Sequence, residues 1–276
     1  MTTLVHPIGA VSSVGAVSLR GRLLQNEVAK VLRLEWRRRS MFIVGLIVFG
    51  LTYLGISFFI GGGHLVKDLM VQTVPALLAV TIVTSAATEG VGSIAEELNG
   101  GTLDQAQLSP ASPQLLALGR MIALALRGLV GATILGLLFI LGLGLDIHVH
   151  PAALVPAALT VLDALGYGLI MIALTIRVAS IGAIVHVGDM AVMAFGGMLL
   201  PISLFPHGME IFARFIPTAL GVQALNTTLA GHGLGAIWSD GTLPWLLVHT
   251  ATMTTLGLVL YVVNIRHARR EGGLSP

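Results

Sequence analysis

The sequence predicts an all-α integral membrane protein, and three observations carry that prediction. Of the 276 residues, 55% are hydrophobic and only 10% are charged, and the mean hydropathy is +0.92. A water-soluble domain needs a polar surface, and this composition supplies too little polar material for one. Long apolar runs also recur along the chain, and a helix of about 20 apolar residues is long enough to cross a bilayer.

Six of these apolar runs are long enough to be membrane spans. They occupy residues 41–60, 69–88, 121–145, 152–176, 185–205 and 243–265. A shorter apolar run within residues 208–228 contains Arg214 and is interrupted by Pro217. We interpret it as a re-entrant element on the outer face rather than as a seventh span. The predicted plan is a flexible tail over residues 1–18, a surface helix over residues 19–40 and a six-span domain over residues 41–276.

The distribution of basic residues predicts the orientation of the spans. Arginine and lysine cluster before the first span and after the last one, and six spans place Arg120 and Arg177 on the same side. Cytoplasmic loops carry the excess of these residues, so both termini are predicted to be cytoplasmic. Arginine far outnumbers lysine, which suits a GC-rich prokaryotic genome and hence a location in the prokaryotic inner membrane. The small net charge of +2 gives no reason to expect nucleic-acid binding.

Residues 19–40 have the pattern of an amphipathic helix that lies on the membrane surface. Apolar side chains recur there at helical spacing, with basic residues between them. The pattern ends in an interfacial anchor formed by Trp36, Arg37, Arg38 and Arg39. A basic helix that is merely solvated is the alternative, and the tryptophan beside three arginines favours the membrane surface.

The connection between the second and third spans, residues 89–120, is polar and predicted to be cytoplasmic. An Asn-Gly-Gly stop at 99–101 ends the helix that continues from the second span and carries Glu96 and Glu97. Thr102 and Gln105 fit a capping box, which predicts a new short helix that a Ser-Pro pair ends. A second Ser-Pro pair at 112–113 supplies the N-cap and first-turn proline of the next helix. A short rigid helix at the membrane surface is what a partner protein can push against.

The same stretch resembles the cytoplasmic connection of the permease subunits of type-2 ATP-binding-cassette exporters. That family shows an acidic residue, then Gly-Thr-Leu-Asp/Glu-Gln, a Ser-Pro, another serine and a Gly-Arg or Gly-Lys that enters the third span. The matching residues here are Glu97, Gly101, Thr102, Leu103, Asp104, Gln105, Ser109, Pro110, Ser112, Gly119 and Arg120. Two outer-face segments, "FGGMLLPISLFP" and "FARFIPTALGVQALN", extend the resemblance, although Ile216-Pro217 stands where the family commonly has Asn-Pro.

The resemblance implies an exporter driven by a separate cytoplasmic ATP-binding-cassette ATPase, which would bind ATP and magnesium. It implies that two copies, or one copy and a sibling permease, form the membrane path. The predicted short helix would be the coupling helix, and its docking residues would be Glu96, Glu97, Gly101, Thr102, Leu103, Asp104, Gln105, Ser109 and Pro110. The substrate class would be hydrophobic or amphiphilic, such as a drug-like molecule, a lipid or a peptide, because the path has few aromatic residues for stacking sugars.

Four polar residues inside the spans are predicted to border the substrate path: Arg127, Asp163, Thr81 and Ser85. Ionisable groups at membrane depth are costly, so each is expected to have a partner or a role. Asp163 and Arg127 lie at compatible depths, which favours a structural ion pair between them. The alternative is that Asp163 attracts a cationic substrate. His249 in the last span is interpreted as a packing histidine.

Three other classes of protein are alternatives to an exporter: importer permeases, stand-alone channels and membrane-embedded enzymes. An importer loop ends in Ile-x-Leu-Pro, which is missing here. The chain has no Walker A motif, because neither lysine follows a glycine, so it is not expected to bind or hydrolyse ATP itself, and no cofactor is predicted on this chain. Ser239 and Asp240 form no convincing triad with a histidine, so no catalytic residue is predicted. His148 and His150 beside Asp146 are interpreted as solvated loop residues, so no metal site is predicted. The absence of cysteine excludes disulfides and thiolate ligands.

Overall fold

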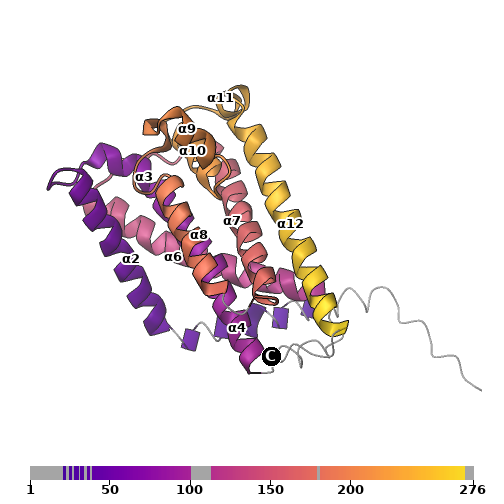
Figure 1. The fold of residues 1–276 in the computed structure, drawn as a ribbon. Coiled ribbons are helices and arrows are strands. Elements are labelled where there is room, and N and C mark those ends of the chain that lie inside the picture. The colour runs from indigo at the N-terminus through magenta and orange to yellow at the C-terminus, as the bar shows by residue number, and fades with distance from the viewer. Residues whose placement is uncertain are drawn as a thin grey trace, which may run out of the picture.

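The computed structural model is a bundle of helices packed side by side (Figure 1). It describes residues 21–100, 113–178 and 181–270, apart from positions 23, 24, 27, 31, 34, 35 and 38. Within these residues, five helices are long and apolar enough to cross a membrane: Arg39–Ile60, Lys67–Asn99, Gln114–Leu143, Pro151–Thr175 and Thr242–His267. The predicted all-helical membrane fold is confirmed at this level.

The second long helix is a continuous rod of three parts. It begins as α3 (Lys67–Thr84), passes through a π-helix, η1 (Ser85–Glu89), and ends as α4 (Gly90–Asn99). The rod stops at Asn99, where the Asn-Gly-Gly sequence predicted a stop. The second predicted span ended at Thr88, eleven residues earlier, and the helix that continues from it was assigned to the cytoplasmic connection. The predicted coupling helix, with Gly101, Thr102, Leu103, Asp104, Gln105, Ser109 and Pro110, lies outside the described residues.

The remaining long helices begin and end close to the predicted positions. α2 (Arg39–Ile60) is followed by the rod, and α6 (Pro113–Leu143) then begins at the predicted first-turn proline. A 3₁₀ turn, η2 (Pro151–Ala153), leads into α7 (Leu154–Thr175), and α12 (Thr242–Arg270) closes the bundle. The apolar runs therefore located these helices well.

The predicted fifth span, residues 185–205, is shorter in the structure than expected. α8 covers only Ile181–Phe195, which is 15 residues and less than the roughly 20 that a crossing needs. It stops because Gly196 and Gly197 follow, and Gly197 takes a left-handed backbone with φ of 91°. The sixth crossing therefore stays a prediction.

Short helices fill the segment between α8 and α12. They are the 3₁₀ turn η3 (Ile202–Leu204), α9 (His207–Ala213), α10 (Ala219–Leu229) and α11 (Leu234–Ser239). α9 and α10 occupy the predicted re-entrant segment, residues 208–228, and a sharp turn at Thr218, with φ of 72°, joins them. Whether this element enters a bilayer stays a prediction.

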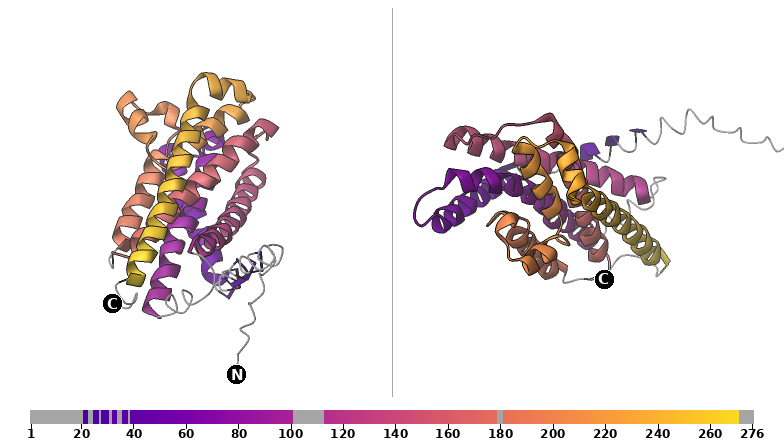
Figure 2. Two further views of the ribbon diagram at one scale, coloured as in Figure 1. Left: turned by 90° about the vertical axis from the view of Figure 1, so that its right-hand side faces the viewer. Right: turned by 90° about the horizontal axis from the view of Figure 1, so that it is seen from above.

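The two ends of the bundle differ in charge. α4 and the C-terminal end of α12 lie at one end, which we call the basic end, and α9, α10 and α11 lie at the other (Figures 1 and 2). The described residues between 21 and 38 are helical and lie at the basic end. Arg120, Arg177 and Arg266 belong to the same end. Among the described residues, those basic residues predicted to share a side lie at one end of the bundle.

The outer surface suits a lipid environment. Large apolar side chains are exposed along α2, α6, α8 and α12, among them Val48, Leu138, Val187 and Val259. Trp36 near the basic end is 70% exposed, and Trp238 and Trp245 at the other end are each 60% exposed. Tryptophans at both ends of an apolar belt are typical of the two membrane–water interfaces.

Glycine allows α7 and α12 to pack closely, and this helix pair is the most extensive in the described part of the chain. A Cβ atom at Gly166 of α7 would lie 2.7 Å from the backbone nitrogen of Thr254 on α12. We expect Gly166→Ala to lower the free energy of unfolding by about 2 kcal/mol, because two backbones would have to separate.

The matched control for that substitution is Gly55→Ala in α2, where a Cβ atom would meet nothing within 4 Å. Alanine in an open helical position should stabilise the helix by roughly 0.5 kcal/mol. Thermal unfolding in detergent measures both variants. Equal shifts in the two melting temperatures would mean that the α7–α12 contact is looser than described.

Candidate functional site

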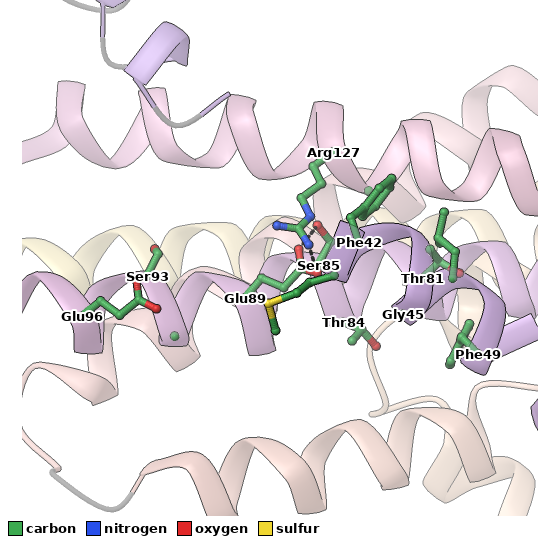
Figure 3. Close-up of a pocket in the computed structure, with 14 residues that line it drawn as sticks. Phe42, Gly45, Phe49, Thr81, Thr84, Ser85, Glu89, Ser93, Glu96 and Arg127 are labelled. Carbon is green, nitrogen blue, oxygen red and sulfur yellow. Dashed lines mark hydrogen bonds and ion pairs between the residues drawn. The ribbon is translucent and has the colours of Figure 1, made fainter. Parts of the chain in front are cut away.

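The candidate site is a cavity of about 350 Å³ between α2, the rod and α6 (Figure 3). Its walls combine apolar side chains from α2 with hydroxyl, carboxylate and guanidinium groups from the other two helices. The lining residues are Met41, Phe42, Gly45, Leu46, Phe49, Thr81, Thr84, Ser85, Glu89, Gly92, Ser93, Glu96, Arg127 and Gly128.

An ion pair between the rod and α6 forms the polar base of this cavity. The Nη2 atom of Arg127 lies 2.5 Å from Oε1 of Glu89. The hydroxyl of Ser85 donates a hydrogen bond of 2.9 Å to the other carboxylate oxygen of Glu89. Phe42 of α2 covers the guanidinium, whose carbon lies 5.1 Å from the ring centroid. Three helices therefore meet at one charged pair.

The π-helix explains why the rod presents polar groups on two sides here. π-helices are usually single-turn insertions in α-helices, and they occur frequently at functional sites. Ser85 and Glu89, at its two ends, face the cavity (Figure 3). The neighbouring Thr88 instead donates its hydroxyl to Asp189 of α8, a residue that is buried. This short segment therefore contacts α6 on one side and α8 on another.

Three of the four residues predicted to border the substrate path line this cavity. Thr81, Ser85 and Arg127 lie together, and Asp163 does not. The predicted ion pair between Asp163 and Arg127 is wrong, because the two residues bind different partners. The pair was predicted because Asp163 and Arg127 lie at similar depths along their helices. Asp163, however, lies on the side of α7 that faces α12 and the turn between α9 and α10.

Asp163 instead holds the end of the bundle opposite the basic end together. It is 1% exposed, and one of its oxygens lies 2.7 Å from Nδ1 of His249 on α12. The other oxygen accepts a 2.9 Å hydrogen bond from the backbone N–H of Thr218. The remaining ring nitrogen of His249 lies 3.4 Å from the carbonyl oxygen of Phe215. This network ties α7, α12 and the turn together, and it gives His249 the partners expected of a packing histidine.

A second charged cluster lies at the basic end, where the rod finishes. Glu97 is bound on both sides, by Arg120 of α6 at 2.7 Å and by Lys30 of the N-terminal helical residues at 3.3 Å. Arg120 is buried, with only 5% of its surface exposed, whereas the side chain of Lys30 is 45% exposed. Glu97, one of the predicted docking residues, thus connects three elements beside the two ends of segment 101–112. Glu96 lies at the mouth of the cavity.

The predicted interfacial anchor has exposed aromatic and basic side chains. Trp36, Arg37 and Arg39 are exposed, and the guanidinium of Arg39 lies 5.5 Å from the Trp36 ring centroid. Arg38 lies outside the described residues. These positions fit a surface anchor, and contact with a membrane stays a prediction.

The loop histidines make only local contacts. Nδ1 of His148 lies 3.4 Å from the exposed Asp146, and His150 accepts a hydrogen bond from the backbone N–H of Ala152. Over the described ranges, no cluster of three or more His, Asp or Glu side chains has the arrangement of a metal site.

Sequence analysis did not assign to the site the two side chains that contact the Arg127 guanidinium, Glu89 and Phe42. Glu89 was assigned to the start of the cytoplasmic connection, although its spacing of four residues from Ser85 is a signal of one continuous helical face. Phe42 had no distinguishing signal, since it is one apolar residue in an apolar span.

The family model of the ABC-2 type transporter matches residues 24–229, which is more than half of the chain and includes the cavity, Lys30, Glu97 and Arg120. No curated protein shows significant similarity to the sequence. The chain therefore belongs to the ABC-2 type transporter family and is a membrane permease subunit of an ATP-binding-cassette transporter.

Proposed function

We propose that this permease is the membrane-spanning subunit of an exporter that moves a hydrophobic or amphiphilic substrate out of the cytoplasm. A separate cytoplasmic ATPase subunit would bind ATP and magnesium and supply the energy. A second copy of the chain, or a sibling permease, would complete the path. The basic end would face the cytoplasm of a prokaryotic cell, in line with the excess of arginine there.

The observation that carries the proposal is the continuous rod Lys67–Asn99. Its 33 residues are about 50 Å long at 1.5 Å per residue, whereas the hydrocarbon core is only about 30 Å thick. The excess length would extend beyond the bilayer and lead directly into segment 101–112, which has the docking pattern. Force applied to that segment would travel along a rigid helix to Glu89 in the cavity.

Co-purification tests the partner. We expect an ATPase encoded near the permease gene to co-purify with the co-expressed wild-type permease in detergent. We expect the variant Glu97→Ala/Thr102→Pro/Leu103→Asp to lose it, because the proline removes the hydroxyl that would cap the docking helix and the aspartate removes its apolar contact. A matched control, Asp146→Ala/Val149→Asp, changes exposed residues at the other end of the bundle and should retain the ATPase.

The direction of transport needs its own measurement. Inside-out vesicles that contain both subunits should accumulate an amphiphilic dye when ATP is added outside. ATP-dependent release of preloaded dye would instead favour an importer. If no ATPase binds either the wild type or the control, a stand-alone channel or a membrane enzyme becomes the better interpretation.

A further inference from the structure

A second hollow lies beside the candidate cavity, on the other side of α2. It is an open hollow of about 580 Å³ that is lined by α2 and by Met193 of α8. Met41, Gly45 and Phe49 line both hollows, and their spacing of four residues places them along one edge of α2. A molecule that crosses this edge would occupy both hollows at once.

The two hollows differ in chemistry. The first contains the ion pair of Glu89 and Arg127 together with several hydroxyl groups. The second is mainly apolar, since Ser40 and Thr52 are the only hydroxyl-bearing residues that line it, and Thr52 already donates to the carbonyl of Val48. A polar chamber joined to an apolar one matches a molecule with a polar head and an apolar tail.

The charge of the pair restricts that head further. The side chains of Glu89 and Arg127 are 29% and 13% exposed, so both charges are partly removed from water. A ligand with one net charge would leave an unbalanced charge in a poorly solvated site, which is costly. A ligand that carries both charges can bind both side chains and keep the site neutral. Glu96 also lines the first hollow and has an interaction of its own.

We propose that the two hollows together bind a zwitterionic amphiphile. Its anionic group would lie at Arg127, its cationic group at Glu89, and its apolar tail between α2 and α8. The depth of the site agrees with this arrangement, since Glu89 lies about 33 Å along the rod from Lys67, close to the thickness of a hydrocarbon core. A charged head at Glu89 would therefore lie near a membrane surface, with its tail directed into the bilayer. The proposal names a substrate class and rests on the proposed function.

Binding to the purified full-length permease tests this proposal without the ATPase. The probe is a single-chain lysophosphatidylethanolamine, compared with an alkylammonium and an alkyl methyl phosphate diester of equal chain length in an uncharged detergent. We expect the wild type to bind the zwitterion at least tenfold more tightly than either singly charged probe. The variant Glu89→Gln/Arg127→Gln should lose that preference. The control Glu210→Gln/Arg214→Gln removes an ion pair at the other end of the bundle and should keep it.

A steric test leaves the charges untouched. A side chain at Gly45 would enter open space between the two hollows, because a Cβ atom there meets nothing within 4 Å. We expect Gly45→Leu to weaken binding of the zwitterion at least tenfold, and Gly55→Leu, an open position on the same helix outside both hollows, to leave it unchanged. If Glu89→Gln/Arg127→Gln fails to fold, the comparison of Gly45→Leu with Gly55→Leu still tests whether the amphiphile occupies the two hollows.

Two results would overturn the proposal. One is equal affinity of the wild type for the three probes, and the other is wild-type affinity in Gly45→Leu. Neither binding measurement involves ATP or the ATPase. A negative result would therefore count against the zwitterionic ligand without affecting the co-purification experiment that tests the exporter.

Discussion

Replacing Asp163 with alanine should destabilise the permease by about 3 kcal/mol, as expected when a buried carboxylate with two hydrogen-bond partners is removed. The carboxylate accepts from the Thr218 backbone and binds His249, so its loss leaves two buried polar groups without their partner. Thermal unfolding in detergent would show the effect. Asp163→Asn should recover part of the loss, because an amide oxygen can still accept one hydrogen bond.

The matched control is Asp146→Ala, which removes the same charge from a loop side chain that is 89% exposed. Little change is expected there. Equal losses for Asp163→Ala and Asp146→Ala would contradict the role assigned to the network. A stable Asp163→Asn protein that no longer transports would revive the alternative in which Asp163 attracts a cationic substrate.

The second large effect is expected at Glu97. Arg120→Ala should lower the free energy of unfolding by about 3 kcal/mol, because it leaves a carboxylate that is only 16% exposed without its buried partner. Lys30→Ala should cost less than about 1 kcal/mol, since the lysine is largely solvated and its bond is longer. Both variants should be measured by unfolding and by ATP-dependent transport.

A double-mutant cycle separates this interaction from simple loss of packing. Glu97→Ala combined with Arg120→Ala should be less damaging than the sum of the two single changes, with a coupling energy of about 2 kcal/mol. Additive effects would mean that the ion pair contributes little. If Arg120→Ala keeps normal stability but loses transport, the ion pair would instead act only in transmitting motion from the ATPase to the membrane helices.

The sequence predicted most helices because long apolar runs and helix-ending glycines and prolines are local signals. α6 begins at Pro113 and the rod stops at Asn99 for reasons that neighbouring residues carry. The end of α8 was placed ten residues too late, because Gly196 and Gly197 lie inside an apolar run and hydropathy does not register backbone conformation.

The candidate site was predicted only in part, for a geometric reason. Depth along a helix can be counted from the sequence, whereas the direction in which a side chain points depends on how the helices pack. Counting placed Arg127 and Asp163 at similar depths, and the packing directed one toward Glu89 and the other toward His249. The π-helix at 85–89 had no recognisable signal, and Glu89 was assigned to the start of the cytoplasmic connection.

The backbone of Thr218 gives the network around Asp163 a further consequence. A branched side chain in a left-handed conformation costs roughly 1–2 kcal/mol, and Thr218 is the one non-glycine residue with positive φ in the described part of the chain. The hydrogen bond from its N–H to Asp163 holds the turn in this strained state. The turn between α9 and α10 therefore stores conformational strain, and breaking that one bond would let Thr218 relax to an ordinary backbone conformation.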